Sequence, residues 1–152
     1  MPRVVVFDEF GGPDVMHVVE EPAVEPAVGE VRVRIEAFAV NPLDQMMRSG
    51  ASPAPIPLPH ARLGVEGTGV IDARGPGVTG LETGDPVILT AIPDANVRGS
   101  YAEYTTLPAS RVIARPAGLA ITEAAAIWVA YSTAYGALVR SEEHTSELQS
   151  PC

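Results

Sequence analysis

The fold of this chain is decided by Glu30-Val31-Arg32-Val33-Arg34-Ile35-Glu36-Ala37, a stretch in which charged and apolar residues alternate. Successive side chains of a β-strand point to opposite faces of a sheet, so a period of two indicates a strand with one buried and one wet face. We therefore expect Val31, Val33 and Ile35 to face a core, while the charged residues between them face water.

Outward from this strand, short apolar runs separated by turn residues continue in both directions. The chain contains 15 Pro and 14 Gly, which favours many turns and short strands over long helices. Residues 51–60 alone include four prolines and predict an irregular loop. The spacing predicts a mostly β barrel or sandwich, with further strands at residues 4–7, 15–20, 64–73, 87–89, 101–107 and 111–114.

Two helices interrupt the strands. Asn41-Pro42-Leu43-Asp44 opens the first, because Asn is a favoured N-cap, Pro suits the first helical position and an acid at the third complements the helix dipole. Gly50 ends this helix. The second is an Ala-rich helix that begins near Glu123, with Thr122 as its cap and a bend around residues 130–132.

Composition excludes several functions. The chain has 152 residues, which fits one domain, and a net charge of −9, which disfavours a nucleic-acid partner. The apolar stretch Ala124–Val139 is too short to span a membrane, so no membrane partner is expected. The single cysteine, Cys152, provides neither a disulfide nor a thiolate metal site, in keeping with a cytoplasmic location.

Five short motifs, in this order and spacing, resemble the medium-chain dehydrogenase/reductase superfamily and, within it, the zinc-free quinone oxidoreductase branch. The motifs are Asn41-Pro42-Leu43-Asp44, Gly64-Val65-Glu66-Gly67-Thr68-Gly69, Gly84-Asp85-Pro86-Val87, Ser100-Tyr101-Ala102-Glu103-Tyr104 and Thr133-Ala134-Tyr135. The resemblance covers roughly residues 1–139. It implies a mostly β (α+β) fold: a GroES-like, partly open β-barrel with a short helix and a C-terminal helix, and a homodimeric parent protein.

The resemblance also implies NADH or NADPH as cofactor, bound mainly by a Rossmann domain that would follow this barrel. The closely spaced glycines at residues 64–69 and 75–80 do not open a helix after a buried strand, so they are not a dinucleotide-binding turn. We therefore expect the Rossmann domain to be missing, and the chain to be a fragment that is inactive alone.

No metal site is expected. Zinc-bearing relatives have a Cys where this chain has Asn41 and a His where it has Val65, and Glu66 alone cannot hold zinc, which needs about three protein ligands at a catalytic site. The relatives' four-cysteine lobe has no counterpart between Asp85 and Tyr101. Without a Lewis acid, an alkoxide would lose several kcal/mol of stabilisation, whereas the charge formed on a quinone or conjugated carbonyl is delocalised. These small molecules are therefore the expected substrates.

The resemblance implies that Asn41, beside the nicotinamide, and Asp44, at the cleft, are catalytic residues, and that Asn41 and Thr133 bind the cofactor. Asn41 can serve as N-cap as well, and Asp44 as its third-position partner. The substrate pocket is expected to include Met47 and Tyr131, for which the alternative roles are core filling and packing. Glu66 is expected to support the barrel and the cleft. No general acid stands out, so the proton would come from solvent.

Three other functions remain open on the sequence: an enoyl-thioester reductase, an alcohol dehydrogenase-like member of the same superfamily, and a non-catalytic β-barrel binding module. The chain itself is divided into a GroES-like catalytic domain (residues 1–120), a helix leading into the absent nucleotide-binding domain (121–140) and a non-native tail (141–152). The tail switches abruptly to Ser, Glu, Thr and Gln and resembles a translated sequencing adapter. We expect it to be disordered.

Overall fold

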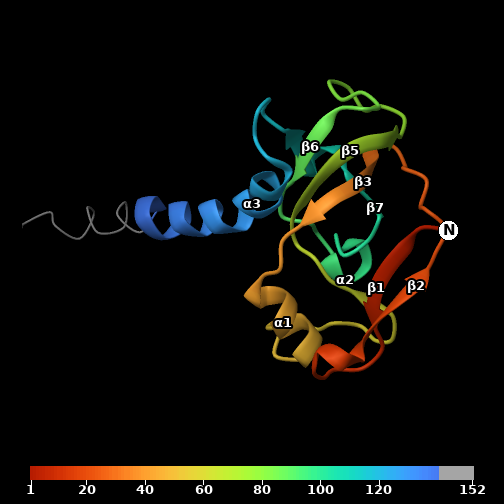
Figure 1. Cartoon of the computed structure of the whole chain (residues 1–152), viewed down its shortest axis with the longest axis vertical. Helices are drawn as coiled ribbons and strands as arrows, with labels where there is room; N and C mark the ends of the chain where they lie inside the picture. The colour runs from red at the N-terminus through yellow and green to blue at the C-terminus, as the bar shows by residue number, and fades with distance from the viewer. Residues whose placement is uncertain (141–152) are drawn as a thin grey trace, which may run out of the picture.

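The computed structural model describes residues 1–140, which form two antiparallel sheets and three helices (Figure 1). The smaller sheet has the strand order β2-β1-β4. Its strands are β1 (Arg3–Phe7), β2 (Met16–Glu20) and β4 (Ala61–Arg62). The 3-10 turn η1 (Pro13–Val15) leads into β2. The strands predicted at residues 4–7 and 15–20 are thus confirmed.

The larger sheet has the order β7-β3-β5-β6-β8, and every neighbouring pair is antiparallel. Val31 and Val33 in β3 are fully buried and Ile35 is half-buried, so the inward face predicted from the alternation is confirmed. The strands are β3 (Glu30–Phe38), β5 (Gly67–Arg74), β6 (Pro86–Leu89), β7 (Tyr104–Pro108) and β8 (Val112–Ala114), with the 3-10 turn η2 (Ala109–Arg111) before β8.

Residues 101–103 join the two sheets. Val4 in β1 bridges to Ala102, and the N–H of Val5 donates to the carbonyl of Tyr101 at 2.8 Å. On the other side, the N–H of Ile35 in β3 donates to the carbonyl of Glu103 at 2.9 Å. Over the described residues the sheets do not close into a ring, which confirms the expected partly open barrel.

Each sheet packs over its own apolar cluster. The first lies inside the larger sheet, and the second fills the space between the smaller sheet and α1, so the sheets are held by burial as well as by hydrogen bonds. The first contains Val31, Val33, Ile71, Val87, Leu89, Ile92, Leu107 and Val112. The second contains Phe7, Met47, Ala61, Leu63, Val65, Ala95 and Tyr101.

Helix α1 (Pro42–Ser49) begins and ends where the sequence predicted. Its last turn closes on Gly50 at φ 79°, the left-handed conformation that glycine adopts at least cost. The short helix α2 (Ala95–Arg98) was not predicted, because four residues give too little periodicity to be recognised.

Helix α3 (Ile121–Tyr135) starts earlier than predicted. Its N-cap is Ala120, not Thr122, and the N–H of Ala120 donates to the carboxylate of Glu123 at 3.2 Å. The helix continues into a π-helical turn, η3 (Gly136–Arg140), and its second half projects away from the β body (Figure 1). The expected tail at residues 141–152 lies outside the described residues.

Two strand predictions were too long. Residues 64–66 are not part of a strand, and β5 begins at Gly67; likewise β7 begins at Tyr104 rather than at residue 101. Both segments bend to meet each other at the core of the site described below. Within β5 the backbone of β3 approaches closely, since a Cβ on Gly69 would lie 2.1 Å from the carbonyl oxygen of Arg34.

Candidate functional site

Asn41 occupies the N-cap of α1 in an extended conformation, as predicted, and forms a capping box with Asp44. Its Nδ2 also donates to Oε1 of Glu66 at 2.9 Å. At the start of the helix, the carboxylate of Asp44 accepts the backbone N–H of Asn41 at 2.8 Å. The predicted pairing of Asn41 with its third-position partner is thus confirmed, and Glu66 binds the Nδ2 group of the amide, which an N-cap does not use.

Asp44 is an almost fully buried carboxylate, 3% exposed. Besides the N–H of Asn41, it accepts the N–H of Gly64 at 3.0 Å and the hydroxyl of Tyr101 at 3.2 Å. Burial raises the pKa of Asp44 above its ordinary value, although these hydrogen bonds act in the opposite direction. Burial, together with the neighbouring Asp44 charge, also raises the pKa of the Tyr101 hydroxyl.

Glu66 is buried even more deeply, at 1% exposed, and joins three parts of the chain. One oxygen accepts the amide of Asn41, and the other accepts the backbone N–H of Val129, in the middle of α3, at 2.9 Å. Its backbone carbonyl accepts the hydroxyl of Ser100 at 2.6 Å. The segment that carries Glu66 therefore fixes both the start of α1 and the position of α3.

Gly64 makes this arrangement possible. Its φ is +104°, and a Cβ at this position would lie 2.3 Å from Oγ of Ser100 and 2.6 Å from the backbone nitrogen of Ser100. Only glycine combines that backbone conformation with so close an approach. The N–H of Gly64 can then reach Asp44 while its carbonyl accepts the N–H of Ser100 at 3.2 Å.

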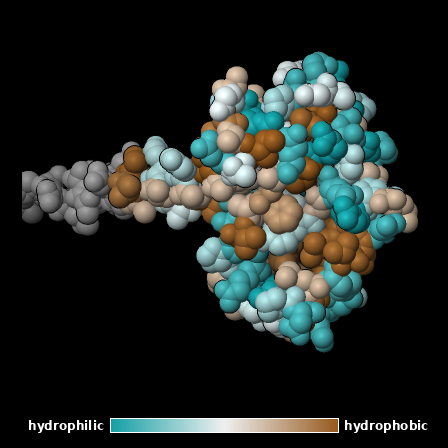
Figure 2. Space-filling model, viewed as in Figure 1, coloured by the Kyte–Doolittle hydropathy of each residue, from teal (hydrophilic) through white to brown (hydrophobic). Residues whose placement is uncertain are grey.

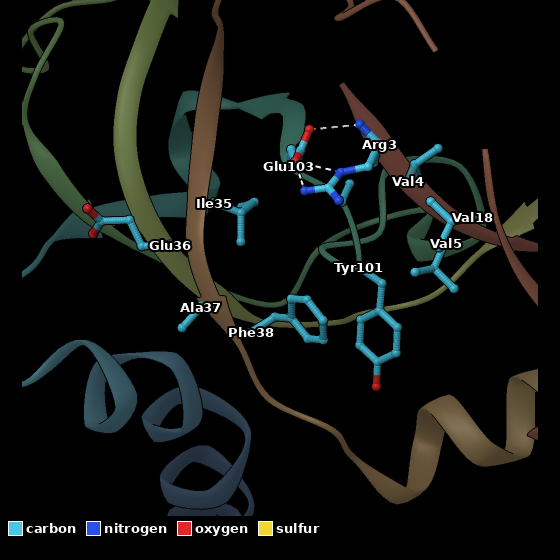
Figure 3. Close-up of a pocket in the computed structure, with 11 residues that line it drawn as sticks. Arg3, Val4, Val5, Val18, Ile35, Glu36, Ala37, Phe38, Tyr101 and Glu103 are labelled. Carbon is cyan, nitrogen blue, oxygen red and sulfur yellow. Dashed lines mark hydrogen bonds and ion pairs between the residues drawn. The ribbon is translucent and has the colours of Figure 1, made fainter. Parts of the chain in front are cut away.

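A hollow of about 480 Å³ lies beside this cluster, between β1 and β3 (Figure 3). Its wall is mainly apolar, and the rings of Phe38 and Tyr101 stack there at a centroid distance of 4.3 Å. An ion pair between Arg3 and Glu103 lies at the rim, at 2.6 Å. Hydrophobic side chains are visible over β1 on this face of the molecule (Figure 2). The size and lining suit a small, flat, apolar molecule.

A second hollow, of about 490 Å³, lies where α3 passes over the end of the larger sheet. Its wall is almost entirely apolar, and Tyr131, 71% exposed, forms part of it. Its lining also includes Ile88, Ile113, Leu119, Ile127, Trp128 and Tyr135. This hollow marks α3 as a helix with an uncovered apolar side in the described part of the chain.

The structure brings some of the predicted site residues together and separates others. Asn41 and Asp44 are directly bonded. Thr133 is exposed on α3, four residues after Val129 and therefore on the same face as the N–H that Glu66 holds. Met47 is buried in the second core cluster, and Tyr131 lines the hollow beside α3, so the shared substrate pocket stays a prediction.

Three residues are more central to the site than their sequence pattern predicts: Glu66, Tyr101 and Gly64. Glu66 was expected to support the cleft, but its bond to Asn41 spans 25 residues and its bond to Val129 spans 63. One signal for Glu66 was available: a charged residue within the apolar, glycine-rich stretch at residues 63–71 must be either exposed or paired.

The side chains at this position do not fit a zinc ion. Val65 is apolar and 8% exposed, and both carboxylate oxygens of Glu66 are occupied by N–H donors. Within residues 1–140, no three His, Cys, Asp or Glu side chains gather as metal ligands. None of the helices in this part of the chain has the length and apolar character needed to cross a bilayer.

Comparison with known proteins places this geometry in context. Residues 27–117 match the alcohol dehydrogenase GroES-like domain. The chain is 36% identical over 140 residues to a Lama guanicoe quinone oxidoreductase, covering 91% of this chain and 41% of that protein. It is 37% identical over 135 residues to the Rattus norvegicus synaptic vesicle membrane protein VAT-1 homolog, covering 88% and 32% respectively.

Among solved structures, the Escherichia coli quinone oxidoreductase complexed with NADPH superposes with a TM-score of 0.83 at 29% identity, over 91% of this chain and 41% of that one. The chain thus spans about two fifths of the length of the quinone oxidoreductases it matches. The chain belongs to the alcohol dehydrogenase GroES-like domain family.

Proposed function

We propose that this chain is the barrel part of an NAD(P)H-dependent, zinc-independent oxidoreductase that reduces quinones or conjugated carbonyls by hydride transfer. The relatives named quinone oxidoreductase, one of them in complex with NADPH, support the oxidoreductase class and the cofactor. The cytoplasmic location and the homodimer expected from the sequence remain predictions.

The proposal depends mainly on one observation, the set of side chains around Asn41. Its amide is held by Glu66, and its neighbour Val65 is apolar, so the site offers hydrogen-bonding groups but too few open ligands for a cation. Hydrogen-bond donors can stabilise the delocalised charge of a reduced quinone or enolate, whereas an alcohol substrate benefits much more from a Lewis acid.

Asn41 and Thr133 are the residues of this chain that would contact the nicotinamide ring. When bound, the cofactor supplies the hydride. The contribution of Asn41 is orientation: because Glu66 holds its Nδ2, the amide oxygen is directed to the opposite side. The proposed proton source is solvent, since Asp44 and Tyr101 are occupied with each other.

The test is NAD(P)H oxidation by a protein that carries this chain together with the remaining length found in its relatives. Turnover with a quinone or an enone that persists in the presence of a strong zinc chelator supports the proposal. Loss of turnover on chelation, restored by zinc, contradicts it. Selective turnover of enoyl thioesters or of alcohols would instead favour the two alternative reductase functions.

A non-catalytic binding module is the second candidate. It is favoured by the 480 Å³ hollow, whose lining includes neither Asn41 nor Asp44. Calorimetric titration of the chain with a small quinone, compared with an Ala102→Trp variant that fills the hollow, distinguishes this candidate. Tight binding by the unmodified chain, combined with the absence of turnover in the longer protein, would favour the module.

A further inference from the structure

Glu66 is a buried carboxylate with no cationic partner. None of the ion pairs formed within residues 1–140 includes it, although it is 1% exposed. Burying a charge without compensation is costly, and here the compensation comes from N–H donors alone. Because an apolar side chain would fill this space at lower cost, packing alone does not explain why a carboxylate is buried here.

The two donors come from different elements. Nδ2 of Asn41 belongs to the turn that starts α1, and the N–H of Val129 belongs to α3. In a regular helix the N–H of Val129 would bond the carbonyl of Ala125, four residues earlier. Its contact with Glu66 therefore ties the middle of α3, and not merely an exposed side chain, to the barrel.

An ionised carboxylate can only accept hydrogen bonds, and this property fixes the orientation of the Asn41 amide. Nδ2 must face Glu66, so the amide oxygen must point the other way. The carboxylate of Glu66 is therefore the shared partner of α3 and of the Asn41 amide.

We propose that Glu66 is a positioning residue that couples the placement of α3 to the orientation of the Asn41 amide. The inference rests on the proposed function only for what the Asn41 amide contacts. The coupling itself is a property of residues 41, 66 and 129 and is measurable on this chain without a cofactor.

The first variant is Glu66→Gln, which has nearly the same shape but only one acceptor oxygen. Its NH₂ group must face either Nδ2 of Asn41 or the N–H of Val129. Nuclear magnetic resonance should then show hydrogen exchange at the Val129 amide, or at the Asn41 side-chain amide, accelerated by about tenfold or more. The matched control is Glu9→Gln, an exposed residue outside the site, which should change neither exchange rate.

The second variant reverses the polarity of the bond. In the double variant Asn41→Asp with Glu66→Gln, the NH₂ of the new amide at position 66 donates to the new carboxylate at position 41, and its oxygen accepts the N–H of Val129. Exchange at Val129 should return to within a few-fold of the original rate. In urea unfolding, the unfolding equilibrium constant should show a favourable coupling of about tenfold or more between the two substitutions.

Unchanged exchange at both amides in Glu66→Gln would overturn the proposal, as would additive effects in the double variant. If Glu66→Gln is too unstable to study, the proposal is tested by comparing the free energies of unfolding of Asn41→Asp and the double variant. The coupling predicts that the double variant is the more stable of the two, and the opposite order refutes it. Adding NADPH and following the Asn41 side-chain signals tests the proposed function separately, because a coupled site can exist whether or not these signals shift.

Discussion

At the scale of single residues, the site is a group of buried carboxylates held by neutral donors. Asp44 accepts three hydrogen bonds and Glu66 accepts two at its side chain, so each charge is satisfied without a cation. Such a network is stable only when every member has its partner, because an unpaired buried polar group costs about 1–3 kcal/mol. Single substitutions here should therefore have effects out of proportion to their size.

Asp44→Asn should lower the free energy of unfolding by about 1–3 kcal/mol at acidic pH, because the new NH₂ group must face a backbone N–H, either that of Gly64 or that of Asn41. Burial raises the pKa of Asp44, so the folded chain holds its proton more tightly than the unfolded chain. Its contribution to stability thus falls as pH rises from its ordinary pKa through the raised folded value. In urea titrations, the difference in free energy of unfolding between the original chain and the variant should therefore become smaller as the pH rises over that range. A difference that grows with pH would show that the pKa of Asp44 is lowered by folding and not raised.

Gly64→Ala should destabilise the chain by about 2 kcal/mol or more, since a positive φ and a collision with the backbone of Ser100 act together. Gly80→Ala is the matched control. Its φ of +75° is also positive, but a Cβ there meets nothing within 4 Å. Thermal unfolding of the two variants separates the steric term from the backbone term. Equal losses of stability in the two variants would mean that Ser100 can move away from the new Cβ at little cost.

At the scale of elements, the sequence offers two possible starts for α3, one capped by Thr122 and one at Ala120. Thr122 is a good cap by type, yet it lies within the helix, and the carboxylate of Glu123 accepts the N–H of Ala120 instead. Burial of Ala124 and Ala125 against the barrel fixes the register of the first turn. The helix therefore begins where the buried pair requires it to begin, and not at the best capping residue.

Glu123→Ala should consequently cost about 0.5–1 kcal/mol, through loss of the hydrogen bond and of a negative charge near the helix N-terminus. Thr122→Ala, one residue earlier and exposed, should be neutral or slightly stabilising. Far-UV circular dichroism during thermal unfolding measures both variants. If Thr122→Ala proves the more damaging of the two, the start at Ala120 is contradicted.

At the scale of the whole molecule, the described chain carries two hollows with largely apolar walls, of about 480 and 490 Å³. Large apolar side chains around the second one are exposed, among them Ile113 and Tyr131. Apolar surface gathered in one place on a soluble domain favours association. We therefore expect the apolar surface beside α3 to be a site of self-association.

The chain should self-associate as its concentration rises, and the double variant Ile113→Glu with Tyr131→Glu should weaken that association by roughly tenfold or more. Val28→Glu is a suitable control, because Val28 is also exposed but lies in a loop away from both hollows. Analytical ultracentrifugation gives the association constants. A control that weakens association as much as the double variant would exclude the α3 side as the contact surface.

The sequence by itself determined the elements whose cause is local. Strand β3 follows from alternation, and α1 follows from a cap, a proline and a terminal glycine within ten residues, because strand and helix rules act between near neighbours. Only the tertiary structure decided where the side chains of the site point. Asn41 turns to Glu66 across 25 residues, Tyr101 reaches Asp44 across 57 and Val129 reaches Glu66 across 63. A buried charge takes the donors that the fold brings to it, and no pattern along the chain specifies which donors those are.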